Sequence, residues 1–241
     1  MLFLQIITPY IIKHDIINIS KRESELYTMK KIKNVIFANY KWLICLICII
    51  SFLALAEDVF NKDIMEGDII GYKFISTYLI SDKVTPLVKI ITSFGGATFL
   101  ILLTIILFIT IKNKKIGYLI GINLISITVL NQLLKFILQR PRPTEYRIID
   151  ETGYSFPSGH SMISMAFYGF LIYIINKKVQ GKKTRIILTC ILSLLILIIG
   201  ISRIYLGVHY TSDVLAGFLV SIAYLTLYIG IINKVTRDKL F

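Results

Sequence analysis

Long, predominantly apolar stretches are the feature that most constrains what this chain can fold into. A membrane-spanning helix needs about 20 apolar residues, because it rises about 1.5 Å per residue through a hydrocarbon core about 30 Å thick. Hydrophobic residues make up 56% of the 241 residues, whereas soluble domains contain roughly 45–50%. The pattern predicts an all-α integral membrane protein with six transmembrane helices. The predicted helices are Val35–Ala56, Ile90–Ile111, Ile116–Leu138, Ser161–Ile175, Ile186–Ile201 and Val214–Ile232.

The basic residues are distributed unequally between the segments that join these helices. With six spans, the N-terminus, the second–third loop, the fourth–fifth loop and the C-terminus share one side, and 18 of the 27 Lys and Arg residues fall there when Lys41, near that end of the first span, is included. Because basic loops stay in the cytoplasm, both termini are predicted to be cytoplasmic. The net charge of +13 then reflects topology, and we expect a lipid bilayer and no nucleic acid as partner.

The external loop, residues 57–89, mixes apolar residues with charges. Such a mixture is typical of amphipathic helices that lie on the outer membrane surface. A packed extracellular cap explains it equally well, and the sequence leaves both alternatives open.

The three cysteines, Cys45, Cys48 and Cys190, all lie inside apolar stretches. Cys45 and Cys48 form a C-x-x-C pattern, but no second ligand pair accompanies it. We therefore predict lipid-facing or packed thiols and no metal or redox site here.

Three polar clusters carry the candidate chemistry, and the six-span topology brings all of them to the outer face. They are residues 135–143 where the third span ends, residues 157–160 where the fourth begins, and Ser202, Arg203, His209 and Asp213 around the fifth–sixth connection. A single charge at a helix end is often an interfacial anchor. The set as a whole contains several cations and little acid to balance them, which indicates a site.

An anion such as phosphate would suit this set of cations. Arginine offers a planar fork that matches phosphate oxygens, and lysine adds a point charge. The turn before the fourth helix would present free backbone N–H groups and the positive end of the helix dipole. Gly159 would allow a close approach of the backbone, and Ser158 would either cap the helix or donate to an oxygen.

Two of the three histidines, His160 and His209, fall in the clusters, and His14 in the N-terminal tail receives no role. An imidazole beside a phosphate acts as nucleophile or as general acid. Asp213 follows His209 by four residues, so one helical turn would bring the two together. A carboxylate on one ring nitrogen fixes the tautomer and leaves the other nitrogen free. These residues alone do not say which histidine attacks, and a purely structural His–Asp hydrogen bond remains an alternative.

A metal is the other interpretation of two histidines and an aspartate. Zinc would lie beside several cations there, and the remaining acids, Glu145, Asp150 and Glu151, occupy the third–fourth loop without ligand-like spacing. We therefore predict no metal and no cofactor.

The three clusters resemble the signatures of the type 2 phosphatidic acid phosphatase (PAP2) family, which shares its site with vanadium haloperoxidases. The family pattern, K-x6-RP, then PSGH, then SR-x5-H-x3-D, is matched at all eleven fixed positions with the correct spacing. The matching region runs from about Gly117 to Tyr228, close to half of the chain, and the first half carries no signature.

The resemblance implies a role for each matched side chain and no metal. His209 corresponds to the nucleophile that takes the phosphoryl group, Asp213 to its orienting partner, and His160 to the acid that protonates the leaving oxygen. The phosphate-binding positions are Lys135, Arg142, Ser158, Gly159 and Arg203.

Four parts of the chain follow from this interpretation. They are a cytoplasmic tail (1–34), two helices with their external loop (35–111), a PAP2-like catalytic region of four helices (112–233) and a short cytoplasmic tail (234–241). Residues 1–28 lack the basic start and the small-residue cleavage site of a signal peptide, and the sequence leaves open whether they belong to the mature protein.

We expect a cell-membrane hydrolase that removes phosphate from a lipid phosphate or diphosphate through a phosphohistidine, at an extracytoplasmic site. Undecaprenyl diphosphate is the first candidate substrate, followed by phosphatidylglycerol phosphate and phosphatidate. A lipid phosphotransferase would instead pass the phosphate to an acceptor other than water. A catalytically silent membrane scaffold is a further alternative, against which the intact set of His160, His209 and Asp213 argues. The sequence leaves the identity of the lipid and the oligomeric state open.

Overall fold

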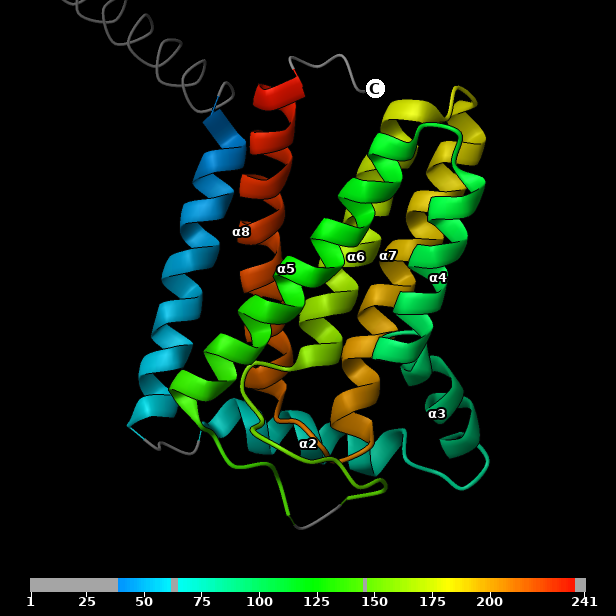
Figure 1. The fold of residues 1–241 in the computed structure, drawn as a ribbon. Helices are drawn as coiled ribbons and strands as arrows, with labels where there is room; N and C mark the ends of the chain where they lie inside the picture. The colour runs from blue at the N-terminus through cyan, green and yellow to red at the C-terminus, as the bar shows by residue number, and fades with distance from the viewer. Residues whose placement is uncertain (1–38, 62–64, 145–146, 237–241) are drawn as a thin grey trace, which may run out of the picture. The chain divides into compact units, whose positions relative to one another are not determined.

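The computed structural model describes residues 39–61, 65–144 and 147–236, and all regular structure in them is helical (Figure 1). The all-α prediction is therefore confirmed for these residues, while the whole predicted N-terminal tail (1–34) and the last residues of the C-terminal tail lie outside them. The helices are Asn39–Phe60, α2 (Glu66–Tyr78), α3 (Thr85–Ser93), α4 (Ala97–Thr110), α5 (Lys114–Leu138), α6 (Gly159–Lys178), α7 (Lys182–Tyr205) and α8 (Thr211–Thr236).

Contacts divide the chain into two units, Met1–Ile44 and Cys45–Phe241. Of the first unit, only the beginning of helix Asn39–Phe60 is described.

Four of the described helices are long and apolar enough to cross a membrane: Asn39–Phe60, α5, α7 and α8. A fifth span results if α3 and α4 count as one, although their axes bend by 48° at the break between them. The predicted second span is thus not one continuous helix. The sixth, α6, stays a prediction, and its 20 residues would extend about 30 Å.

Helix α6 is surrounded by protein, which explains why its sequence is less apolar than that of a lipid-facing helix. It packs against α5, α7 and α8. Its buried positions include Ser161, Ser164 and Ala166, small residues that allow close helix contacts in membranes, beside Phe167 and Phe170.

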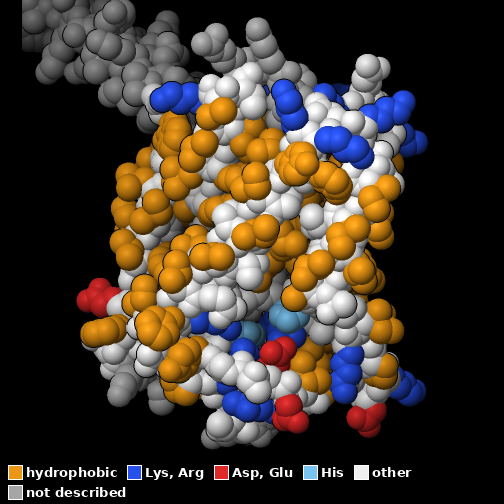
Figure 2. All heavy atoms as spheres, in the orientation of Figure 1, with side chains coloured by type: hydrophobic (Ala, Val, Ile, Leu, Met, Phe, Trp, Pro, Cys, Tyr) orange, Lys and Arg blue, Asp and Glu red, His pale blue; other side chains and the backbone are white. Residues whose placement is uncertain are grey.

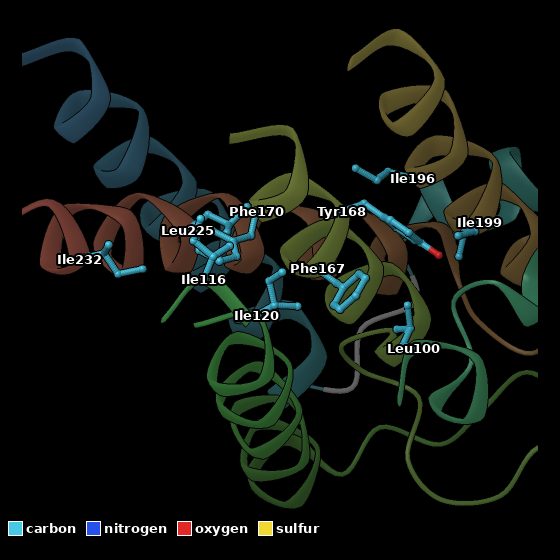
Figure 3. Packing of buried hydrophobic residues seen from close by; sticks show 10 residues of the cluster. All are labelled: Leu100, Ile116, Ile120, Phe167, Tyr168, Phe170, Ile196, Ile199, Leu225 and Ile232. Atoms are coloured by element: carbon cyan, nitrogen blue, oxygen red, sulfur yellow. The ribbon is translucent and has the colours of Figure 1, made fainter. Parts of the chain in front are cut away.

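The main apolar core is formed by side chains from all five helices between α4 and α8, including α4 and α8 themselves (Figure 3). Its buried members are Leu100, Ile116, Ile120, Phe167, Tyr168, Phe170, Ile196, Ile199, Leu225 and Ile232. Many other apolar side chains of these helices point outward. Ile105 and Leu194, for example, are 50% and 58% exposed. Figure 2 shows them as an apolar surface along the helices. Such a surface fits hydrocarbon rather than water.

The described part of the loop that was predicted to be external contains α2, which packs as a cap on the helix bundle. Helix α2 lies across the ends of α7 and α8 (Figure 1) and packs against both. Ile75 of α2 joins a buried cluster with Tyr205 and Val208. The packed-cap alternative therefore applies to the face of α2 that carries Ile75. Ile70 and Phe74 on its other face are exposed.

Candidate active site

The end of α5 delivers the first cluster. Gln139, the residue after the helix, is in the left-handed conformation with φ 44°, which ends a helix. Pro141 and Pro143 follow and cannot continue it. The chain therefore leaves α5 just after Lys135 and carries Arg142 in a loop that leads to α6.

The start of α6 is tied to the start of α8. The backbone N–H of Ser158 donates to the carbonyl oxygen of Asp213 at 3.0 Å. The Ser158 side chain makes no capping bond to α6, which contradicts the capping alternative and leaves donation to a phosphate oxygen as the prediction for this residue. Its Oγ instead lies 3.0 Å from Ser161 Oγ. Gly159 does permit a close approach, since an added Cβ would lie 3.1 Å from the side-chain oxygen of Asn131.

His209 lies in the short connection between α7 and α8, and Asp213 lies in the first turn of α8. Nδ1 of His209 is 3.2 Å from Oδ2 of Asp213, so the predicted contact is present although His209 precedes the helix. Nε2 is 3.1 Å from Nη1 of Arg142. Because a guanidinium can only donate, Nε2 accepts and the proton of the neutral ring lies on Nδ1.

Burial sets the protonation state of His209, whose side chain is only 2% exposed. Burial lowers its pKa to about 4, even though the hydrogen bond and charge of Asp213 act in the opposite direction. Near neutral pH the ring is therefore uncharged, with the lone pair of Nε2 on the side of the arginines.

Most N–H donors of Arg142 are hydrogen-bonded within the protein. Its guanidinium donates to the carbonyl oxygens of Thr152, Gly153 and Val208 at 2.9, 2.9 and 3.1 Å. Together with the contact to His209, these bonds occupy four of the five N–H groups that a guanidinium offers. Arg142 thus holds the loop around the site and has little left for an external anion.

Arg203 has donors to spare, although its side chain is only 1% exposed. Nη1 donates to Thr92 Oγ1 at 3.0 Å, and Nη2 lies 2.5 Å from Oε1 of Glu151. Its Nε has no hydrogen-bond partner within the described part of the chain. An unpaired buried donor of this kind is unfavourable, and an anion beside it would remove the penalty.

Glu151 supplies an anion to both arginines. Its second oxygen lies 4.0 Å from Nη2 of Arg142. Burial alone would raise the pKa of Glu151, but the charge and hydrogen bond of Arg203, followed by the charge of Arg142, lower it below its usual range. The sequence placed Glu151 in the loop between the first two clusters but did not predict its contact with the arginines, so the cluster contains one more acid than expected.

The remaining two predicted residues lie around the same centre. Lys135 donates from Nζ to the carbonyl oxygen of Tyr154 at 2.7 Å. His160, the second residue of α6, lies against the break between α3 and α4, where a Cβ on Gly95 would be 3.2 Å from its ring. Figure 2 shows histidine side chains inside a hollow, among basic and acidic side chains.

The sequence profile of the PAP2 superfamily matches residues 115–237, just over half of the chain. The chain belongs to the PAP2 superfamily. The matched region contains all the predicted site residues.

Curated and solved relatives agree with the PAP2 assignment. The chain is 32% identical to phosphatidylglycerophosphatase B of Bacillus subtilis strain 168, over 62% of this chain and 75% of that protein. It is 28% identical to an undecaprenyl-diphosphatase of Sulfolobus acidocaldarius, over 74% and 84% of the two chains. The crystal structure of a transmembrane PAP2-type phosphatidylglycerolphosphate phosphatase from Bacillus subtilis superposes with a TM-score of 0.73 at 28% identity, over 81% and 98%. That of Aquifex aeolicus LpxE gives 0.52 at 26% identity, over 65% and 92%. The predictions of a multi-pass membrane protein and of a PAP2 phosphatase are thereby confirmed.

Four side chains outside the PAP2 motifs bind the side chain of Arg203 or of Asp213, and sequence reasoning assigned a role to none of them. Glu151 and Thr92 bind Arg203, while Ser155 and Arg140 bind Asp213. Arg140 carried a signal, since it lies inside the first polar cluster. The other three had no local pattern to single them out.

Metal ligands are not grouped in residues 39–61, 65–144 and 147–236, where no three His, Cys, Asp or Glu side chains are arranged to hold an ion. The positive charge at the site comes from side chains instead.

Proposed function

We propose that this PAP2 protein hydrolyses lipid phosphates or diphosphates through a phosphohistidine formed on His209. The observation that carries the proposal is the orientation of that ring. Nδ1 is held by Asp213 while Nε2 lies beside Arg142 and close to Arg203. The nitrogen that carries the lone pair, Nε2, is therefore the one beside the anion-binding groups, and it attacks phosphorus once the bound phosphate replaces its contact with Arg142.

The reaction proceeds in two steps. Nε2 of His209 forms a bond to phosphorus while the bond from phosphorus to the lipid oxygen breaks, and His160 gives a proton to that oxygen. Burial and the neighbouring cations lower the pKa of His160 to about 2, so in this proposal His160 takes up that proton only when the negative charge of the bound phosphate offsets the cations. Water then attacks the phosphohistidine, His160 takes back a proton from the water, and inorganic phosphate leaves. Asp213 stabilises the positive charge that develops on the ring in the first step.

Arg203 is the principal phosphate ligand in this proposal, and Lys135 adds a second charge. The free Nε of Arg203 and the carboxylate of Glu151 on its Nη2 support this assignment. They indicate that an anion is favourable at this position. Arg142 contributes mainly by holding His209, and Ser158 and Gly159 contribute the start of α6.

A lipid suits the surroundings of the site. The hollow in Figure 2 lies next to the apolar surface of the helices, and Phe136 and Ile137, which follow Lys135, are 71% and 65% exposed. An amphiphile could place its phosphate among the cations and its tails along this surface. Phosphatidylglycerol phosphate and undecaprenyl diphosphate, which the relatives' names specify, are the first candidates, and phosphatidate is the third.

The test is phosphate release by the purified protein from a panel of these lipids, in excess EDTA and with the His209→Ala variant as the inactive control. We expect release from at least one lipid, unaffected by EDTA. A requirement for a divalent metal would contradict the mechanism. Transfer of the phosphate to an added alcohol in preference to water would identify a phosphotransferase.

A further inference from the structure

A chain of three buried charges leads from the cap to the catalytic aspartate. Asp68 in the first turn of α2, Arg140 and Asp213 are each at least nine-tenths buried. Arg140 donates from Nη2 to Oδ2 of Asp68 and from Nη1 to Oδ1 of Asp213, at 2.7 Å in both cases. Its guanidinium also lies 4.0 Å from the ring centre of Tyr210.

Ser212 closes the network from the other side. Its backbone N–H donates to Oδ1 of Asp68 at 2.7 Å, and its hydroxyl lies 2.8 Å from Oδ2. The same hydroxyl accepts from Arg140 at 2.7 Å. Helix α2 of the cap approaches the start of α8 closely at Gly71, where an added Cβ would lie only 2.2 Å from Thr211 Oγ1.

The two oxygens of Asp213 are used differently. Oδ2 faces His209 and also accepts from the backbone N–H of Tyr210 and from the Ser155 hydroxyl. Oδ1 accepts from Arg140. A cation on Oδ1 fixes the plane of the carboxylate and draws its charge away from the histidine. A contact that served only to attach the cap would not need this second bond, since Asp68 already binds Ser212.

We propose that Arg140 is a positioning residue for His209 and acts through Asp213. Asp68 is the counter-ion of Arg140 and sets how strongly the charge of Arg140 affects Asp213. The inference rests on the proposed function of His209. Burial alone would lower the pKa of Arg140, but Asp213 and Asp68 raise it, so the guanidinium remains charged.

The two outer charges should act on His209 with opposite sign. Removing the positive charge of Arg140 leaves Asp213 more available to stabilise a protonated ring, which raises the pKa of His209. Removing the negative charge of Asp68 leaves Arg140 to act on Asp213 alone, which lowers it. The other charged or titratable groups around His209 are the same in every variant: Asp213, Glu151, Arg142, Arg203, His160 and Lys135.

The experiment is the pH dependence of kcat/KM for p-nitrophenyl phosphate, whose acidic limb reports the nucleophile of the free enzyme. We expect Arg140→Gln to move this limb to higher pH and Asp68→Asn to move it to lower pH, each by about half a unit or more. Arg140→Lys should keep the limb near its wild-type position while kcat falls, because the charge stays and the fork is lost.

Matched controls exist for both charges. Glu66 is an exposed acid in the same turn of α2 as Asp68, and Arg147 is an exposed arginine in the same loop as Arg140. Glu66→Gln and Arg147→Gln should leave the limb unchanged.

The inference would be overturned if the acidic limb did not move, or if it moved in the same direction in Arg140→Gln and Asp68→Asn. The Asp68–Arg140–Asp213 network would then serve only to attach the cap. If Arg140→Gln does not fold, the other two variants decide: the limb should move to lower pH in Asp68→Asn and stay near its wild-type position in Arg140→Lys. A wild-type protein that releases no phosphate would contradict the proposed function itself, which separates the two failures.

Discussion

Arg203 and Arg142 lie at the same proposed anion site but differ in how many N–H donors remain for a ligand. A buried donor without a partner costs about 1–3 kcal/mol, and Nε of Arg203 is in this state. Arg142, in contrast, is bound to three backbone carbonyl oxygens. Substrate binding would therefore relieve an unfavourable state at Arg203, whereas Arg142 already has its partners.

Glu151 competes with a phosphate for Arg203, so its removal should favour substrate. We expect Glu151→Gln to lower KM by roughly three- to tenfold, the size of a partly exposed ion pair, with kcat little changed. Steady-state kinetics on a lipid phosphate measures both. Asp150→Asn, at an exposed neighbouring position, is the control. A higher KM in Glu151→Gln would mean that the carboxylate holds Arg203 in place for the substrate.

The two histidines should respond differently to the leaving group. His209→Ala removes the proposed phosphoryl acceptor and should abolish turnover of every substrate. His160→Ala removes a proton donor, which a lipid alcohol needs and a nitrophenol largely does not. We expect a loss of roughly 10²–10⁴ on lipid phosphate for His160→Ala, and a much smaller loss on p-nitrophenyl phosphate.

Assays of both variants on both substrates decide the assignment. Rescue of His209→Ala by the good leaving group would reverse the two roles. Equal loss in both variants on both substrates would make His160 a phosphate ligand as well as an acid.

At the scale of single residues, the sequence predicted what local spacing encodes. The His209–Asp213 pair is four residues apart and is found in contact. Asp68 and Arg140 are 72 residues apart, and Thr92 and Arg203 are 111 residues apart. Such contacts depend on how the helices pack, which a single sequence does not specify.

At the scale of elements, the broken second span was the main difference between prediction and structure. Residues 90–111 read as one apolar helix, but the chain bends between α3 and α4 by 48°. The bend brings Thr92 to Arg203 and Gly95 to His160. The Gly95-Gly96 pair was the only local sign of it, since glycine is tolerated in membrane helices as well as at breaks.

Gly95 should be intolerant of even one added methyl group. A Cβ there would lie 2.7 Å from Cγ2 of Ile199 and 3.2 Å from the ring of His160, so the break or the ring must move. We expect Gly95→Ala to lower kcat by roughly 10- to 100-fold, because displacements of about 1 Å cost this much in catalysis. Gly121→Ala is the control, since its nearest neighbour would be at 3.9 Å. Normal kcat in Gly95→Ala would mean that His160 does not depend on the break.

At the scale of the whole molecule, the helix content and the membrane character followed from the apolar stretches alone. Each predicted span overlaps an observed helix, with ends that differ by several residues. Only the number of crossings depends on more than length and apolarity. Helix α6 is embedded in protein, and the hydropathy of its sequence reflects those neighbours rather than lipid.

Whether α6 crosses the membrane decides the topology, because residues 150 and 183 flank it. If it crosses, the basic α6–α7 connection is cytoplasmic and the loop carrying Glu151 is external, as the distribution of 18 of the 27 basic residues predicts. Asp150→Cys and Lys183→Cys, each in a variant without the three native cysteines, place a single thiol at an exposed position on either side. We expect a membrane-impermeant maleimide to label position 150 in intact cells and position 183 only after permeabilisation. Labelling of both from the same side would mean that α6 does not cross, and the six-span arrangement with both termini in the cytoplasm would be wrong.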